Sequence, residues 1–448
     1  MTLPSFSYAH ALDILSSISQ EHLLHYWESL SPKEKAALLQ QVQALDFPTF
    51  RLQQRLLTES HAPAAPFSPL MPPDSIGNRR DEELGKQLMD EGAVGCLILA
   101  GGQGTRLDFD GPKGMCPITP VMQKSLFQLF AEKTAAASQQ ASKKLPLALM
   151  TSPANHRETE TFFASHSRFG LEPGQLSLFS QQTLPVLDQE GNLFLERPGK
   201  IAMSPDGNGK VFAHFYQSGL WQKWQQQGVR LVNLVLIDNP LADPFDAELF
   251  GYHERNKNSI TLKCCLKKEP QEKVGVLVQR QGKIEVVEYS ELPEKARFAA
   301  DPSGQLLYKY ANLSLFCFSM EQIRELAVCS TTLPLHKSLK NALQNEKKTM
   351  AWKFETFIFD LLPHATKTGV LLYPRERCFA PLKNSTGDNS IETVRHALQA
   401  RDQELFASIA PEAESIPPFE LSQAFHYPTA SLLSQWHTFH GRATGYIE

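Results

Sequence analysis

Hydrophobic residues first recur at helical spacing, from about residue 8 to residue 60, which predicts a helical N-terminal region. Within this region Ser31 can cap a helix, Pro32 suits the first helical position and Glu34 can complete a capping box. The segment from His61 to Pro73 then holds five prolines. It predicts an extended connector, because proline lacks the N–H that a helix interior needs.

From about residue 92, apolar runs of strand length alternate with longer segments at helical spacing. The expected strands are 94–99, 145–150 and 231–237, and the expected helices are 125–140, 155–166 and 210–227. This alternation predicts an α/β fold, with a Rossmann-like, mixed but mostly parallel sheet flanked by helices. Two β-rich arms around Gln281-Gly282 predict a hairpin added to that sheet. After about residue 386 the pattern becomes helical again and then irregular.

The chain has 448 residues, which is too long for one simple core. We expect three consecutive regions. Residues 1–90 would form the helical region with its proline-rich connector, residues 91–385 the catalytic Rossmann-like domain, and residues 386–448 a small C-terminal region.

Composition narrows the class of protein. Hydrophobic residues make up 42% and charged residues 21%, as in ordinary globular proteins, and the net charge is −4. We therefore expect no nucleic-acid partner, because there is no overall positive field. No signal peptide or membrane span is predicted, and seven cysteines without a C-x-x-C pair predict reduced, mostly buried thiols. Together these features predict a soluble, cytoplasmic protein.

The loop LILAGGQGTRLDFDGPKGM, residues 97–115, follows an apparently buried strand. Glycines at the carboxyl end of such a strand can bring backbone N–H groups close to a phosphate. The loop is not a Walker A motif, because Thr105-Arg106 follows Gly104, and Leu107 replaces the third glycine of a dinucleotide fingerprint. Arg106 and Lys113 could neutralise phosphate charge. The alternative is a strand-to-turn corner with solvated cations.

A second polar position lies at the same expected sheet edge. Asp238 comes directly after the apolar strand 231–237, and a carboxylate there could hold Mg²⁺. A simple helix or turn cap is the alternative reading for an aspartate at this place.

Several blocks of sequence carry a resemblance to a known family. AGGQGTRL followed by PKG resembles the signature of the eukaryotic-type UDP-sugar pyrophosphorylases. Further blocks follow in the family's order: MTSPANHRETETFF, FSQQTLPVLDQEGNLFLE, MSPDGNGKVF, LIDNPLADP, VGVLVQRQGKIEVVEYSE, KFETFIFD and FAPLKN. They span residues 97 to about 396. The chain is most similar to the UDP-N-acetylglucosamine pyrophosphorylases and more distantly similar to the UDP-glucose pyrophosphorylases.

The resemblance implies a fold of nucleotidyltransferase type and a uridylyltransferase reaction. UTP and N-acetylglucosamine 1-phosphate would give UDP-N-acetylglucosamine and pyrophosphate, by in-line attack of the sugar phosphate on the α-phosphorus of UTP. Mg²⁺ would be the cofactor. UDP-glucose, or a broader range of UDP-sugars, is the alternative product. UTP and a hexose 1-phosphate would be the partners, with no nucleic acid and no membrane.

The resemblance also assigns roles to individual residues. Arg106 and Lys113 correspond to the catalytic cations, and Asp238 to the carboxylate at the nucleotide and metal. The nucleotide-binding positions correspond to Leu99, Ala100, Gly101, Gly102, Lys113, Gln182, Gly207, Asp238 and Lys353. The sugar- and phosphate-binding positions correspond to Asn208, Gly275, Glu288, Tyr289, Asn312 and Lys383. Without the resemblance, most of these positions would be read as ordinary loop, strand or surface residues.

The chain departs from the family pattern at a few places. Ala311 stands where the family usually has glycine beside the sugar-contacting asparagine, which bears on sugar specificity. Asp108 and Cys116 replace the commoner Gly and Tyr. The C-terminal region is short, and the family's small β-rich C-terminal part, which often mediates contacts between subunits, is expected to be reduced or replaced. The oligomeric state therefore stays open, with a monomer slightly favoured.

Two other classes of protein stay open at this stage. A nucleotide-sugar-binding protein without catalysis is one, and the presence of Arg106, Lys113 and Asp238 argues against it. A dehydrogenase is the other, and the failed dinucleotide fingerprint disfavours it.

Overall fold

The computed structural model describes residues 6–59, 66–329, 333–345 and 347–448, which form two compact units. The N-terminal unit comprises Met1–Ala65, Gln182–Gly209 and Leu333–Phe357, and the sheet unit comprises Pro66–Gln181, Lys210–Thr332 and Ile358–Glu448. This division differs from the three consecutive regions expected from the sequence. The N-terminal helices share a core with two later segments, whereas the chain after Pro66 and the C-terminal region pack with the sheet.

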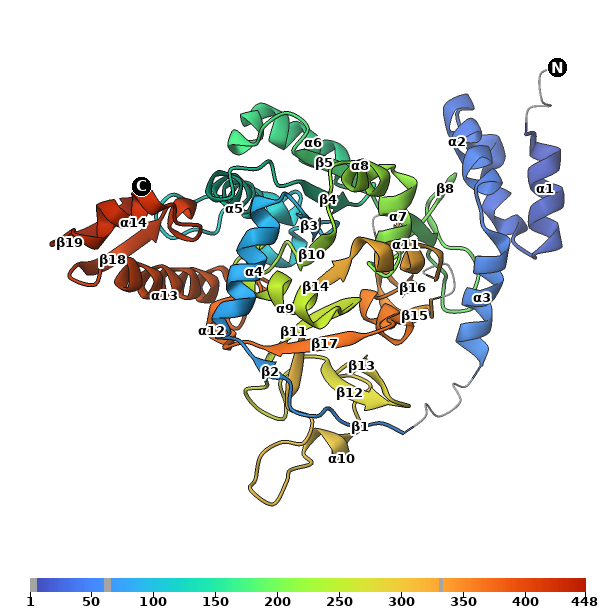
Figure 1. Cartoon of the computed structure of the whole chain (residues 1–448). Coiled ribbons are helices and arrows are strands. Elements are labelled where there is room, and N and C mark those ends of the chain that lie inside the picture. Colours follow the sequence, from blue (N-terminus) through green and yellow to red (C-terminus); the bar gives the residue numbers. More distant parts are fainter. Residues whose placement is uncertain (1–5, 60–65, 330–332, 346) are drawn as a thin grey trace. The chain divides into compact units, whose positions relative to one another are not determined.

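The sheet unit is built on an 11-stranded sheet among the described residues (Figure 1). Its strands are β1 (Ser68–Pro69), β2 (Asp74–Ser75), β3 (Val94–Leu99), β4 (Leu147–Thr151), β5 (Leu176–Ser180), β10 (Leu231–Leu236), β11 (Ile260–Leu266), β12 (Val276–Arg280), β13 (Lys283–Val287), β14 (Tyr310–Ser319) and β17 (Thr368–Leu372). The main path runs β2-β17-β11-β14-β10-β3-β4-β5, and every pair on it is parallel except the two that β14 makes. The expected mixed, mostly parallel α/β sheet is therefore confirmed.

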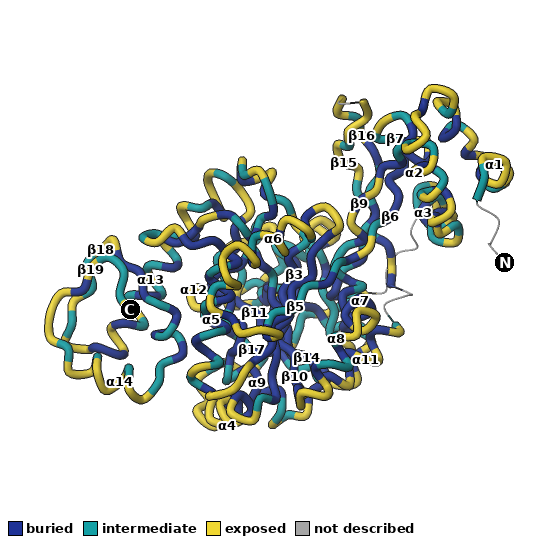
Figure 2. Tube along the Cα trace, turned by 90° about the horizontal axis from the view of Figure 1, so that it is seen from above, coloured by how far each residue is buried: buried dark blue, intermediate teal, exposed yellow. Residues whose placement is uncertain are grey.

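The strand that precedes the glycine loop, β3, is buried on both faces of the sheet. All six of its residues are buried, and successive side chains point to opposite faces of the sheet. On one face Val94, Cys96 and Ile98 join a core with helices α5 (Leu126–Gln140) and α9 (Ala247–Asn256). On the other face Gly95 leaves room for the ring of Trp224, which would lie 2.7 Å from an added Cβ. Figure 2 shows this buried centre of the unit in dark blue.

Helices cover the sheet, connect its strands and continue into the C-terminal region. They are α4 (Arg79–Asp90), α5 (Leu126–Gln140), α6 (His156–Ser165), α7 (Val211–Gln217), α8 (Leu220–Gln226), α9 (Ala247–Asn256), α10 (Glu294–Arg297), α11 (Met320–Cys329), α12 (Arg375–Cys378), α13 (Ile391–Ile409) and α14 (Ala430–His437). Short 3-10 helices η3 (Thr105–Leu107), η4 (Lys113–Met115), η5 (Ser167–Gly170), η7 (Ile358–His364) and η8 (Gln423–Phe425) lie between them. The single helix expected over 210–227 is two helices, separated at Gly219.

The expected hairpin is confirmed. Strands β12 and β13 pair antiparallel, and the two residues between them, Gln281 and Gly282, both have positive φ. A two-residue turn with this geometry matches the twist of the flanking strands.

The C-terminal region corrects one sequence expectation. After α13 the chain is not irregular: β18 (Glu414–Leu421) and β19 (Arg442–Ile447) form a parallel pair with α14 between them, on a small core around Phe406. The region is tied to the rest of the unit through Glu420, whose carboxylate accepts the backbone N–H groups of Val121 and Met122 at 2.9 Å. These two residues follow the glycine loop along the chain.

The N-terminal unit combines three helices with antiparallel strand pairs. Its elements are α1 (Tyr8–Ser17), η1 (Glu21–Leu24), η2 (Trp27–Ser29), α2 (Pro32–Gln43), α3 (Phe47–Thr58), β6 (Thr183–Pro185), β7 (Leu195–Arg197), β8 (Lys200–Ile201), β9 (Met203–Pro205), β15 (His336–Gln344) and β16 (Lys347–Glu355). The capping box expected at Ser31 and Glu34 is present. Buried amides join the distant segments, since Gln53 Nε2 donates to Pro185 O at 3.0 Å.

The proline-rich connector lies partly within the described residues, and the cysteines are mostly buried. His61 to Ala65 lie outside the described residues, and the part that follows pairs with β12 through the short strand β1. Six of the seven cysteines are buried, as expected. Among the described residues, no helix combines the length and the apolar composition that crossing a bilayer would need.

Candidate nucleotide and sugar-phosphate site

The glycine loop leaves β3 at the carboxyl edge of the sheet and folds back on itself. Gly102 O accepts the N–H of Lys113 at 3.1 Å, and Gly111 O accepts the N–H of Gly104 at 2.9 Å. These bonds place η3, which carries Arg106, and η4, which begins at Lys113, on one short loop. Asp108, one of the departures from the family pattern, has φ +53°. Glycine fits such a conformation without strain, and aspartate is one of the few other residues that tolerate it.

Lys113 is largely buried beside Asp238. Its Nζ lies 3.8 Å from Asp238 Oδ2 and donates a hydrogen bond to Leu382 O at 3.3 Å. Burial lowers the pKa of Lys113; the Asp238 carboxylate raises it, and the positive charges of Arg106 and Lys383 lower it further. Residues predicted from three separate sequence blocks therefore act electrostatically on Lys113 at this edge of the sheet.

One carboxylate oxygen of Asp238 is free of hydrogen bonds to the described residues. The residue follows β10, and its backbone O accepts the N–H of Leu382 at 2.7 Å. Its Oδ1 is buried and has no hydrogen-bond partner within the described part of the chain. A buried carboxylate oxygen without a partner is costly, and Mg²⁺ prefers such oxygen ligands. Asp238 therefore fits a metal ligand. Among the described residues, no group of three or more His, Cys, Asp or Glu could hold a metal ion.

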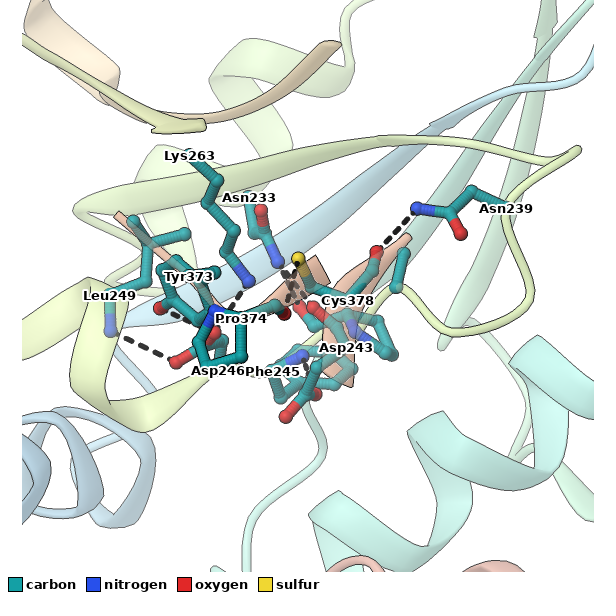
Figure 3. Close-up of polar contacts among 12 residues, drawn as sticks. Asn233, Asn239, Asp243, Phe245, Asp246, Leu249, Lys263, Tyr373, Pro374 and Cys378 are labelled. Carbon is teal, nitrogen blue, oxygen red and sulfur yellow. Dashed lines mark hydrogen bonds and ion pairs between the residues drawn. The ribbon is translucent and has the colours of Figure 1, made fainter. Parts of the chain in front are cut away.

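Asn239, the next residue, connects Asp238 to the segment that carries Lys383. Its Nδ2 donates to Cys378 O at 2.8 Å, and its Oδ1 accepts the N–H of Ala380 at 3.0 Å. Figure 3 shows the bond to Cys378 O and, in the same view, the buried ion pair between Lys263 and Asp246. The side-chain amide thus holds two loops of the site at a fixed spacing.

The buried ion pair joins Lys263 on β11 to Asp246, with 2.5 Å between Nζ and Oδ2, and Tyr373 OH donates to the same Oδ2 at 2.8 Å (Figure 3). Burial opposes both charges, but their mutual attraction leaves the pKa of Asp246 below and the pKa of Lys263 above the usual values. This network holds Asp246, which caps helix α9, to strand β11 and to Tyr373.

Three of the predicted sugar-binding residues lie together on the hairpin side of the sheet. Asn312 N donates to Gly275 O at 2.9 Å, and a Cβ added to Gly275 would lie 3.1 Å from Glu288 Oε1. Tyr289 follows Glu288 along the chain and is exposed. The structure therefore brings Gly275, Glu288 and Asn312 into one cluster, with Tyr289 next to it in sequence.

Ala311 turns out to face away from this cluster. It is fully buried and belongs to the core that also contains Cys265 and Leu313. Successive residues of a strand point to opposite faces, so its methyl group lies on the face opposite the side chain of Asn312. The departure from glycine at this position is therefore accommodated by the core.

Four predicted residues belong to the N-terminal unit: Gln182, Gly207, Asn208 and Lys353. Gln182 O accepts the N–H of Asp206 at 3.1 Å, and Gly207 pairs with Thr356 beyond the end of β16, the strand that carries Lys353. Gly207 has φ +87°, and a Cβ there would lie 2.2 Å from Thr356 O. The position therefore requires glycine. The remaining predicted residues belong to the sheet unit.

Sequence reasoning missed several residues that support the loop. Asn239 and the backbone of Leu382 shape the surroundings of Lys113, and Ser152 and Asn155 bond to the glycine loop. No local motif marks these residues, since each acts on a segment that is remote in the sequence. The only available signal was that Ser152 and Asn155 follow a strand expected to lie in the same sheet.

A glycine loop at the carboxyl edge of a mostly parallel sheet, with a buried lysine–aspartate pair beside it, is typical of α/β proteins that bind nucleotide phosphates. The family model described as UTP–glucose-1-phosphate uridylyltransferase matches residues 56–431, and the chain belongs to this family.

Individual relatives are similar over most of their length. UDP-N-acetylglucosamine diphosphorylase 2 of Arabidopsis thaliana is 33% identical over 401 residues, which are 84% of this chain and 80% of the relative. UDP-N-acetylglucosamine pyrophosphorylase of Saccharomyces cerevisiae is 31% identical over 414 residues, 84% of this chain and 87% of the relative. The solved structure of the uridine diphosphate N-acetylglucosamine pyrophosphorylase of Trypanosoma brucei, in complex with an inhibitor, has a TM-score of 0.81 at 25% identity and covers 100% of this chain and 99% of that one.

Proposed function

We propose that the protein is a nucleotidyltransferase that forms UDP-N-acetylglucosamine and pyrophosphate from UTP and N-acetylglucosamine 1-phosphate. The observation that carries the proposal is Lys113, a buried cation held between Asp238 and Leu382 O beside the glycine loop. Membership of the family supports the uridylyltransferase reaction, and the relatives named for N-acetylglucosamine support that sugar over glucose.

The chemistry needs no covalent intermediate on the protein. An oxygen of the sugar phosphate attacks the α-phosphorus of UTP and a new P–O bond forms. The bond between the α-phosphorus and the oxygen that bridges to the β-phosphorus breaks, which releases pyrophosphate. Lys113 and Arg106 would neutralise the negative charge that moves onto the transferring and leaving groups. Catalysis then consists of positioning and charge neutralisation.

We further propose Mg²⁺ as the cofactor, with Asp238 as its protein ligand. The unpartnered Asp238 Oδ1 supports this assignment. When bound, Mg²⁺ would neutralise charge on the phosphates. We expect activity to be lost in EDTA and restored by added Mg²⁺, and we expect Asp238→Asn to require more Mg²⁺ for half-maximal activity. Full activity in EDTA would contradict the assignment.

The remaining assignments rest on the family resemblance. Leu99, Ala100, Gly101 and Gly102 would contact the nucleotide through their backbone, Gln182 would bind the uracil, and Gly207 and Lys353 would bind the nucleotide. Asn208, Gly275, Glu288, Tyr289, Asn312 and Lys383 would bind the sugar phosphate. We also propose that the protein is monomeric, which light scattering on the purified protein would test. We propose a cytoplasmic location, which microscopy of a tagged chain would test.

The reaction itself is tested by incubating purified protein with UTP, Mg²⁺ and N-acetylglucosamine 1-phosphate. Pyrophosphate and UDP-N-acetylglucosamine should appear in equal amounts. Binding of UTP without turnover of any hexose 1-phosphate would instead favour a nucleotide-sugar-binding protein without catalysis.

A further inference from the structure

Three consecutive backbone carbonyls of the glycine loop are held by two residues that follow β4. Asn155 Nδ2 donates to Ala100 O at 3.0 Å and to Gly102 O at 3.3 Å. Ser152 Oγ donates to Gly101 O at 2.9 Å. Strand β4 lies next to β3 in the sheet, so the loops that follow the two strands are neighbours.

These bonds determine where the N–H groups of the loop point. In a trans peptide the C=O of one residue and the N–H of the next point in opposite directions. Holding the carbonyls of Ala100, Gly101 and Gly102 toward β4 therefore turns the N–H groups of Gly101, Gly102 and Gln103 the other way. Within the described part of the chain, none of these three N–H groups donates to a protein acceptor. They form a row of donors suited to phosphate oxygens.

The side chain of Asn155 makes these contacts instead of capping its own helix, α6. It occupies the N-cap position of α6, where asparagine normally accepts an N–H from the first turn, yet its side chain makes no capping bond. Instead its Oδ1 accepts the N–H of Ser152 at 2.8 Å, which leaves Nδ2 directed at the glycine loop. Both side chains are 1% exposed. Leaving the first turn of α6 uncapped costs stability. The side chain of Asn155 therefore stabilises the glycine loop at the expense of its own helix.

We propose that Ser152 and Asn155 are positioning residues that hold the glycine loop with its N–H groups directed at the phosphates of UTP. The proposal rests on the proposed function, and it adds two residues that act on the glycine loop through its backbone carbonyls. Without the pair, the loop peptides are free to rotate and the row of donors is lost. The effect should fall on ligands with phosphates and spare the recognition of uridine.

The test compares Asn155→Ala and Ser152→Ala with Gln175→Ala. Gln175 is a matched control, because it is also a buried amide that joins separate segments of the same unit: its Nε2 donates to Ser138 Oγ on helix α5 at 2.8 Å and to Leu145 O at 3.0 Å. Leu145 precedes β4, so the control lies at the opposite end of the strand that Ser152 follows. All three variants should unfold at a lower temperature than the wild type.

Calorimetric titration with UTP, pyrophosphate and uridine separates the outcomes and needs no turnover, so it remains informative even if the proposed reaction fails. We expect Asn155→Ala to weaken UTP and pyrophosphate binding at least tenfold and uridine binding less than twofold, with a smaller loss for Ser152→Ala and none for Gln175→Ala. In the assay, Asn155→Ala should raise the KM for UTP and leave the KM for the sugar phosphate near the wild-type value.

UTP affinity within twofold of wild type in Asn155→Ala, or an equal loss in Gln175→Ala, would overturn the proposal. Should Asn155→Ala not fold, Ser152→Ala decides by the same comparison.

Discussion

At Lys113, burial and local charge oppose each other. Burial and the neighbouring cations favour the neutral amine, whereas Asp238 favours the charged form, and the pKa of Lys113 is lowered on balance. The phosphates of a bound substrate would add negative charge and stabilise the ammonium group. A lysine in this environment is well suited to respond to charge that develops during a reaction.

Removing this cation should affect catalysis more than folding. We predict that Lys113→Ala lowers kcat by at least ~10²-fold, as losses of comparable transition-state charge stabilisation do. Lys143→Ala, which removes an exposed lysine of the same unit, should retain wild-type kinetics. Steady-state kinetics on both variants check the prediction, and a kcat for Lys113→Ala within a few-fold of wild type would remove the residue from its assigned role.

The lowered pKa also predicts a dependence on pH. A base with a lowered pKa loses its proton earlier as the pH rises, so kcat/KM for UTP should fall on the alkaline side at a pH below the usual lysine value of 10.5. Lys113→Arg keeps its charge throughout this range. The alkaline fall should therefore disappear in Lys113→Arg, whatever its overall activity. A pH profile that is identical in the two proteins would show that another group titrates.

The residues that the sequence could predict are those whose role is carried by a local motif. Arg106 and Lys113 lie on one loop, and Asp238 directly follows a strand, so their placement at the sheet edge could be expected. Asn239, Ser152 and Asn155 act on segments remote in the sequence, and only the register of neighbouring strands brings them to the site. Ala311 could not be interpreted from sequence, because its meaning depends on which face of β14 it occupies.

Among the elements, the C-terminal strand pair is attached to the segment that follows the glycine loop. Glu420, at the end of β18, accepts two backbone N–H groups from the segment after η4, and Lys124 Nζ in the same segment donates to Tyr446 OH on β19 at 2.8 Å. These contacts explain how a short C-terminal region folds against the sheet unit. The sequence predicted its helix but not its strands, because β18 carries Pro417-Pro418, which is unusual inside a strand.

Glu420 should stabilise this attachment. We predict that Glu420→Ala lowers the free energy of unfolding by about 1–3 kcal/mol, the usual loss when hydrogen bonds to a buried charged group are removed. Glu412→Ala, at an exposed position of the same region, should change it by less than about 0.5 kcal/mol. Urea unfolding followed by tryptophan fluorescence measures both variants. Equal stabilities would mean that the carboxylate does not hold the C-terminal region in place.

At the scale of the whole chain, sequence periodicity predicted most helices and strands but not the grouping of segments into units. Local patterns report which face of an element is apolar, whereas the N-terminal unit is assembled from three segments far apart in the sequence. One of its connections is Gln41, whose amide exchanges two hydrogen bonds with the backbone of Ile201 at 3.1 and 3.2 Å. Polar contacts of this kind leave no periodic signal.

The sugar preference is tested by measuring kcat/KM for N-acetylglucosamine 1-phosphate and for glucose 1-phosphate, at saturating UTP and Mg²⁺ on one preparation. We predict that the N-acetylglucosamine phosphate is preferred by at least ~10-fold, because a pocket that binds the acetamido group loses those contacts with glucose. Equal values, or a preference for glucose 1-phosphate, would contradict the account.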